Sequence, residues 1–230
     1  MKMYEKMQLL PLFQGLNLND FSDILSTLKL DFEQYSEGDA IICQGDAMQR
    51  LTYIIDGDFE IEYRCLHPNM ILTEICSNTP YIIEPYNLFS VKRTSERTYT
   101  FRSKGATFSI DRRVFTNKIL KHPLVKSNMI NYTCNMLRKI CDERNEMVSL
   151  TIDQKILHLV TQMCKIPNGR KRIKIKMEEL ADCIQETRLN VSKTLNQWND
   201  AGFISLGRSG WEIIDLNKTT KTQATTPNGL

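Results

Sequence analysis

A run of apolar residues at helical spacing crosses the middle of the chain and separates two halves with different sequence patterns. Between residues 130 and 148 these positions recur at alternating intervals of four and three residues, which is typical of a coiled-coil seam. We expect one helix over about 124–150, with this seam against a second copy of the chain. The seam comprises Ile130, Cys134, Leu137, Cys141, Arg144 and Val148. A second stripe, expected to face the preceding domain, comprises Leu124, Tyr132, Met136, Ile140 and Met147. The alternative, a core helix with one broad apolar face, stays open.

The residues before this helix have the period of β-strands. "YSEGDAIICQGD" and "LTYIIDGDFEIEY" place glycines between short β-branched and aromatic runs, and Asp56-Gly57-Asp58 is typical of a tight turn. Further strand-like runs follow as far as Asp111, at "MILTEI", "PYIIE", "RTYTFRS" and "ATFSID". Several short strands at close spacing predict an antiparallel roll or barrel.

The residues after the long helix predict a winged helix-turn-helix. An amphipathic helix ("DQKILHLVTQMCK") precedes the basic segment "KIPNGRKRIKIK", and a short helix ("MEELADCI") follows it. Gln185-Glu186-Thr187 can form the turn, with Thr187 as the N-cap of a second helix. "FISLGRSGWEIID" then has the pattern of a hairpin. Two helices joined by so short a turn, with a basic strand and a hairpin, indicate binding to the DNA major groove.

The second helix of this pair carries a leucine where water would be expected. Val191, Leu195 and Trp198 form its buried stripe, and Leu189 falls on the opposite, polar side. A leucine in the major groove can contact a thymine methyl group but cannot accept a hydrogen bond from cytosine N4. The alternative, an exposed leucine with no role, is also common on protein surfaces.

The order of these segments resembles the CRP/FNR family of bacterial transcription regulators. "LPLFQGLNLNDF", "YSEGDAIICQGD" and "TRLNVSKTL" are similar to its opening helix, first roll strands and recognition helix. The resemblance implies an α+β fold: a jelly-roll of the cyclic-nucleotide-binding type, a dimerisation helix and a C-terminal winged helix-turn-helix. We expect domain boundaries at 1–122, 123–150 and 151–217, with a disordered tail at 218–230.

The resemblance also assigns roles on the second helix. Arg188 matches the arginine that reads guanine, Lys193 matches a base- or phosphate-contacting arginine, and Leu189 replaces a glutamate that accepts from cytosine. Together with the basic strand and the wing, the expected DNA-binding residues are Thr187, Arg188, Leu189, Asn190, Ser192, Lys193, Asn196, Lys171, Arg172, Lys174 and Arg208.

The family's phosphate-binding cassette is only partly matched. In "IIEPYNLFSVKRTSERTYT" the resemblance aligns Leu88, Arg97 and Thr98 with cassette positions, but Glu84-Pro85 replaces its Gly-Glu pair. Ile140 and Cys141 stand where the family contacts adenine through hydroxyl groups. The expected ligand-binding residues are therefore Glu84, Leu88, Arg97, Thr98, Ile140 and Cys141, with a small-molecule effector other than cyclic AMP, or none.

The remaining features exclude several classes of function. The seven cysteines include no C-x-x-C pair and no metal-site spacing, and neither a signal peptide nor a membrane span is expected. The three histidines are dispersed with no nucleophile nearby, which argues against an enzyme. We expect a cytoplasmic homodimer whose partners are double-stranded DNA and, in transcription, RNA polymerase. The alternative is a nucleotide- or small-ligand-sensing module that does not bind DNA.

Overall fold

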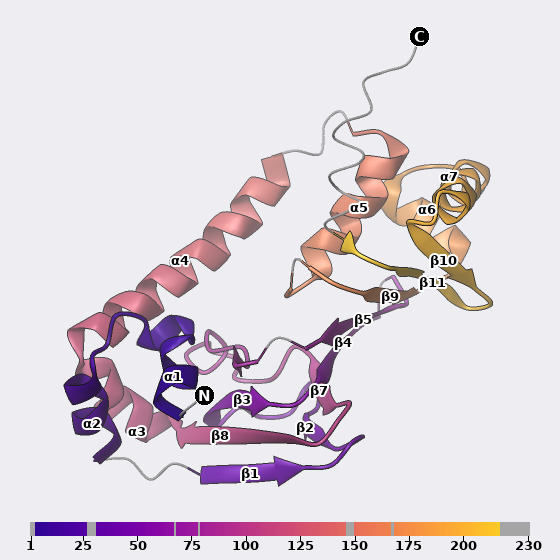
Figure 1. Cartoon of the computed structure of the whole chain (residues 1–230). Helices are drawn as coiled ribbons and strands as arrows, with labels where there is room; N and C mark the ends of the chain where they lie inside the picture. Colours follow the sequence, from indigo (N-terminus) through magenta and orange to yellow (C-terminus); the bar gives the residue numbers. More distant parts are fainter. Residues whose placement is uncertain are drawn as a thin grey trace. The chain divides into compact units, whose positions relative to one another are not determined.

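A computed structural model describes residues 3–26, 31–66, 68–77, 79–145, 150–166 and 168–216. They divide into two compact units, one comprising 1–59 and 77–139 and the other 60–76 and 140–230. Both units mix helices with antiparallel strands (Figure 1), so the predicted α+β class is confirmed. The predicted tail at 218–230 lies outside the described residues. None of the helices within the described ranges has the length and apolar character needed to cross a membrane.

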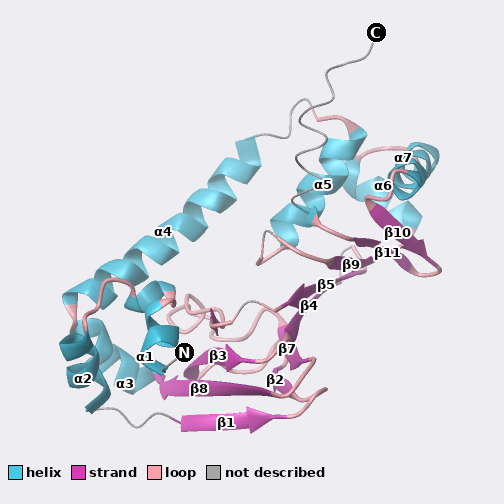
Figure 2. Cartoon of the chain, viewed as in Figure 1, coloured by secondary structure: helices cyan, strands magenta, loops and turns pink. Residues whose placement is uncertain are grey.

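The first unit is built on a four-stranded antiparallel sheet in the order β1-β8-β3-β6, and its strand β2 pairs with β7. Helices α1, α2 and α3 gather at one end of strands β1 and β8 (Figure 2). The strands are β1 (Asp31–Tyr35), β2 (Ala40–Ile42), β3 (Arg50–Asp56), β6 (Tyr81–Ile82), β7 (Thr98–Phe101) and β8 (Gly105–Asp111). The helices are α1 (Met3–Gln8), η1 (Pro11–Phe13), α2 (Leu18–Ser26), α3 (Arg112–Asn117), η2 (Ile119–Lys121) and α4 (Pro123–Asn145).

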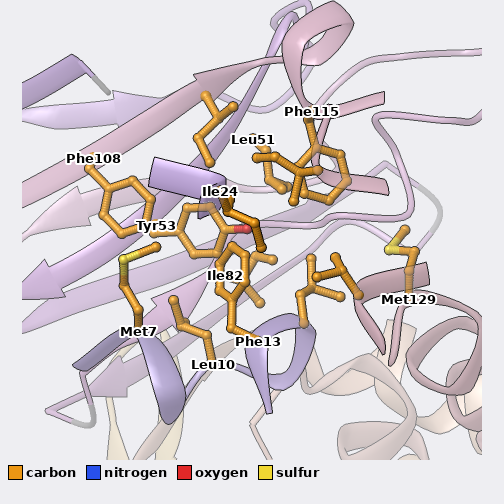
Figure 3. Close-up of a cluster of buried hydrophobic side chains, with 14 of the residues drawn as sticks. Met7, Leu10, Phe13, Ile24, Leu51, Tyr53, Ile82, Phe108, Phe115 and Met129 are labelled. Atoms are coloured by element: carbon orange, nitrogen blue, oxygen red, sulfur yellow. The ribbon is translucent and has the colours of Figure 1, made fainter. Parts of the chain in front are cut away.

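The core of the first unit is aromatic at its centre. The Tyr53 ring of β3 stacks on the Phe108 ring of β8 with centroids 4.4 Å apart, and Phe13 lies 5.7 Å from Tyr53 (Figure 3). Val125 and Met129 of α4 close this core, and Tyr132 packs partly against it. Burial of these large apolar side chains is what joins the N-terminal helices and the start of α4 to the sheet.

The long helix is confirmed, and Tyr132 and Met136 of the predicted inner stripe are partly buried, but Leu124 does not belong to that stripe. Leu124 is 43% exposed, whereas Val125 and Met129, one helical turn apart, are buried. The Asn128 side chain adds hydrogen bonds from Nδ2 to the carbonyl oxygens of Leu12 (3.2 Å) and Gln14 (2.8 Å). The N-terminal segment therefore sets the rotation of α4. Residues 146–149 lie outside the described part, as does Val148 of the seam.

The second unit contains the predicted winged helix-turn-helix. Its strands are β4 (Phe59–Cys65), β5 (Met70–Cys76), β9 (Lys171–Lys174), β10 (Ile204–Gly207) and β11 (Gly210–Ile213), and its helices are α5 (Ile152–Met163), α6 (Met177–Ile184) and α7 (Arg188–Asp200). A capping box between Thr151 and Gln154 begins α5. The strands run in the order β10-β11-β9-β5-β4. The unit thus includes residues 60–76, which we expected to belong wholly to the roll.

Strand β5 joins this unit because it pairs with β9 and fills its core. Glu74 lies opposite Lys171 and Leu72 lies opposite Ile173 in the antiparallel register. Met70 and Leu72 pack in the same cluster as Ile173 and the helix-turn-helix side chains. Strand β9 therefore lies between β11 and β5, with both of its backbone edges hydrogen-bonded.

A fully buried ion pair fixes this strand pairing. Lys171 Nζ lies 3.1 Å from Glu74 Oε2, and neither side chain is exposed. The Glu74 carboxylate also accepts hydrogen bonds from the backbone N–H groups of Lys165 (2.7 Å) and Ile166 (2.9 Å), and Lys171 Nζ donates to the Asn168 carbonyl (2.7 Å). Burial, followed by the negative charge of Glu74, raises the pKa of the neighbouring Cys76 thiol to about 12.

Removing one partner of this pair should destabilise the second unit strongly. Lys171→Met leaves a buried, uncompensated carboxylate, and we expect a loss of about 3–5 kcal/mol in the free energy of unfolding. Glu74→Gln combined with Lys171→Met should lose less, because no unpaired charge remains. Denaturant unfolding of both variants measures this, with Arg172→Met, a partly exposed neighbour, as the control. Equal stability of Lys171→Met and the wild type would contradict the account.

Candidate DNA-reading surface

The turn between α6 and α7 has the geometry of a helix-turn-helix. Helix α6 ends at Ile184, and the φ of 55° at its C-cap, Gln185, places that residue in the left-handed region. Helix α7 begins after Thr187, whose hydroxyl accepts a hydrogen bond from the Asn190 N–H at 3.2 Å. The predicted N-cap is thus confirmed, and the two helices are joined by three residues.

Helix α7 has one buried face that seats it on the rest of the unit. Val191 and Leu195 are completely buried, and Trp198 nearly so. Trp198 Nε1 donates to Asp153 of α5 at 2.6 Å, and its ring packs edge-on against Trp211 of the wing. These contacts leave α7 a single orientation in which the opposite face is open.

The open face of α7 carries the residues expected to read DNA. Leu189 is 78% exposed, as the sequence pattern predicted. Ser192 is partly buried. The exposed members are Thr187, Arg188, Leu189, Asn190, Lys193 and Asn196. The face therefore combines a guanidinium, an ammonium, two amides and an isolated leucine, which are groups that can contact base edges and phosphates.

The turn before α7 is held by an ion pair to α5. Lys155 Nζ lies 2.6 Å from Glu186 Oε1, with both side chains about three-quarters buried. Since Glu186 immediately precedes the N-cap Thr187, the pair positions the tip of α7 on α5. The sequence alone does not reveal this contact, because neither residue differs from the polar pattern around it.

The wing and strand β9 add a second cationic region next to the helix pair. Strands β10 and β11 form a hairpin whose turn exposes Arg208. A side chain at Gly210 would overlap the carbonyl group of Ile173, so this position requires glycine. A groove of about 440 Å³ is lined by the turn of the wing, the end of β9 and the start of α6. Its lining includes Lys174, Lys176 and Arg208.

Lys171 is not part of this surface, and its assignment as a phosphate contact was wrong. Its side chain is completely buried and paired with Glu74. Arg172 is partly exposed and Lys174 is exposed, because strand residues alternate between faces and Lys171 shares the inner face with Ile173. Lys176, which we did not select, is exposed and lines the groove. The same alternation, extended past the strand, could have identified it.

Glu84, one of the expected ligand-binding residues of the first unit, lies in a buried polar site. Glu84 has a φ of 35° and is almost completely buried. Its carboxylate accepts hydrogen bonds from Tyr99 Oη (3.1 Å), Asn87 Nδ2 (2.8 Å) and the Glu96 N–H (2.8 Å). Burial and the nearby Tyr81 and Glu84 raise the pKa of the Tyr99 hydroxyl well above its usual value, so it remains a donor to Glu84.

The other members of that set have different surroundings. Leu88 and Arg97 are buried, and Thr98 Oγ1 accepts a hydrogen bond from the Gln44 N–H at 2.9 Å. The Ser95 hydroxyl donates to the Arg97 carbonyl at 2.7 Å, which ties Arg97 into the loop that follows Glu84. Cys141 is exposed on α4, and the side chain of Ile140 lies outside the described residues.

Comparison with known proteins agrees with the geometry of the second unit. Residues 154–218 match the family model of the Crp-like helix-turn-helix domain. No curated protein matches the chain. Among solved structures, the chain is similar to the catabolite activator protein of Thermus thermophilus, with 20% identity over 92% of this chain and 97% of that chain and a TM-score of 0.48. It is similar to the c-di-GMP responsive global regulator CLP of Xanthomonas campestris, with 15% identity over 86% of this chain and 99% of that chain and a TM-score of 0.49.

The residues that match the helix-turn-helix family model span α5, β9, α6, α7 and the wing. The chain therefore carries a Crp-like helix-turn-helix domain at residues 154–218, as its resemblance to the CRP/FNR regulators predicted.

Proposed function

We propose that the chain is a sequence-specific transcription regulator of the CRP/FNR type that binds double-stranded DNA as a homodimer. The observation that carries this proposal is the open face of α7. Its buried side is fixed by Val191, Leu195 and Trp198, and its exposed side presents Arg188 and Leu189 at the N-terminal end. The N-terminal residues of a recognition helix are those that contact base edges in the major groove.

The cationic groups around α7 support a division of labour in DNA binding. Arg172, Lys174 and Arg208 belong to β9 and the wing, and Lys176 lies just before α6. Such groups attract phosphates independently of sequence and set the orientation of the protein on the duplex. Arg188, Leu189, Asn190 and Asn196 then discriminate between bases, while Thr187, Ser192 and Lys193 contact the backbone or neighbouring base edges.

Selection of bound duplexes from a random DNA pool tests the proposal. The wild type should select a two-fold motif whose half-sites lie roughly 34 Å apart, about one helical turn. Arg188→Ala should cost about 1–3 kcal/mol at one guanine and relax the preference there, since a bidentate arginine–guanine contact contributes that much. Leu189→Glu should shift an adjacent preference from thymine to cytosine. An unchanged motif for Leu189→Glu would assign the leucine no role in reading, and no selected motif for the wild type would contradict the function itself.

The exposed seam of α4 supports the homodimer. In this seam Ile130 and Leu137 are 54% and 57% exposed. Cys134 and Cys141, the other two described apolar residues of the seam, are also exposed. Val125 and Met129 on another face of the helix are already buried in the first unit. A helix with one face in its own core and a second apolar face open to water is typical of a dimerisation helix, and the four–three spacing matches a second copy of itself.

A charge in this seam should separate the dimer. Leu137→Asp places a carboxylate where the partner helix would exclude water, and we expect a monomer at micromolar concentration. Asn135→Asp adds the same charge at an exposed position outside the seam and should leave the dimer intact. Sedimentation equilibrium of the three proteins decides the question. A wild type that sediments as a monomer would refute the dimer without affecting the assignment of α7.

The first unit supports an effector other than cyclic AMP. The Glu84 carboxylate would have to bind a ribose, but it already accepts hydrogen bonds from Tyr99, Asn87 and the Glu96 backbone. A ribose hydroxyl would compete with these buried donors, and each displaced donor would need a new partner. Arg97, Leu88 and Thr98 remain candidates for binding a different small molecule.

A further inference from the structure

The arginine at the tip of α7 is paired with a glutamate from the preceding helix. Arg188 Nε lies 3.1 Å from Glu178 Oε1, and both side chains are mostly exposed. Arg188 is the first residue of α7, and Glu178 lies in the first turn of α6. The pair therefore lies on the surface formed by the two helices of the helix-turn-helix, at the residue proposed to contact guanine.

The atoms involved leave the outer edge of the guanidinium available. A guanidinium presents five N–H groups in a planar fork, and two of them can bond in parallel to O6 and N7 of guanine. In Arg188 the carboxylate engages Nε, the nitrogen next to the aliphatic stem. The two terminal amino groups lie at the far end of the plane. A carboxylate bound at Nε thus restrains the arginine without occupying the groups that would contact the base.

Restraint of this kind matters for an exposed arginine. The free side chain has many rotamers, and part of this freedom is lost whenever a contact fixes the side chain. An ion pair that already exists in the free protein orders the arginine before DNA binds. Less rotamer entropy is then lost when the arginine contacts the base. The same effect favours the one geometry in which both terminal amino groups meet guanine over looser contacts with other bases.

The charge of Glu178 is otherwise unfavourable at this position. Glu178 lines the groove that also contains Lys174, Lys176 and Arg208, and a carboxylate there repels the phosphates that these cations would attract. Glu178 is not needed for a favourable interaction with the α6 helix dipole, because Glu179 also lies in the first turn of α6. Its contact with Arg188 is the feature that distinguishes Glu178 from its neighbour.

We propose that Glu178 is a positioning residue for base recognition: it holds Arg188 so that the terminal amino groups face guanine. The inference rests on the proposed function, because it concerns how Arg188 reads DNA. It assigns the specificity of the guanine contact to two residues from different helices. Glu178 itself contacts no base.

Competition binding with the full-length protein tests this. Duplexes carrying the selected motif, or the same motif with the Arg188-dependent guanine replaced, are compared for wild type, Glu178→Gln and Asp182→Asn. Asp182 carries the same charge on the same helix and is exposed, so its substitution controls for the change in net charge. Both substitutions should raise the affinity for unrelated DNA alike, since each removes one negative charge. Only Glu178→Gln should also reduce guanine discrimination, by roughly two- to fivefold, the range of an exposed ion pair.

A double-mutant comparison separates positioning from other effects. In the Arg188→Ala background, Glu178→Gln should change discrimination at that base pair no further, because the residue it acts through is gone. Discrimination by Glu178→Gln equal to that of Asp182→Asn would overturn the inference, and increased discrimination would show that Glu178 competes with the base. Both results leave the proposed function intact if the wild type selects a motif and Arg188→Ala relaxes it. Absence of any selected motif would instead refute the function on which the inference rests.

Discussion

The buried Glu74–Lys171 pair is the constraint on which the reading surface depends. Two charges without solvent are tolerated only when each is paired and hydrogen-bonded, and here three backbone groups complete the arrangement. The pair fixes the register of β9 against β5, and β9 leads directly into α6. It also fixes which side chains of β9 point outward, so that Lys174 faces the groove while Lys171 lies inside. The position of α6, and through it α7, follows from this register.

The reading face gains its selectivity from a small number of groups. In the resembled family a glutamate lies next to the arginine and accepts from cytosine, whereas Leu189 can only make an apolar contact. Arg188 is the one guanidinium on the exposed face of α7, and we propose that its geometry carries more of the discrimination. A carboxylate beside it, Glu178, is chemically consistent with that demand: it comes from α6 and pairs with the arginine at Nε. In the proposed function the face combines the guanidinium of Arg188 and the apolar side chain of Leu189 with the amides of Asn190 and Asn196.

Local pattern predicted the parts of this structure that local contacts determine. The α6–α7 pair, the Thr187 cap, the wing and the exposed Leu189 all follow from periodicity and capping within about thirty residues of sequence. Lys171 was assigned wrongly because its partner Glu74 is 97 residues away, and no pattern around Lys171 reveals it. Leu124 was assigned to the inner stripe of α4 wrongly for a similar reason: the N-terminal segment, bound through Asn128, sets the rotation of the helix. Pairings distant in sequence decided both outcomes.

The central claim, that the open face of α7 reads the major groove with Leu189 in contact with a thymine methyl group, is tested most directly by single thymine-to-uracil replacements in the selected site. Uracil lacks only the 5-methyl group and keeps every hydrogen-bonding group of thymine. A buried methyl contributes about 0.8 kcal/mol, so wild-type affinity should fall about fourfold at one thymine in each half-site. Leu189→Ala should be indifferent to that replacement. Wild-type binding that is unaffected by uracil at every position of the site would contradict the claim.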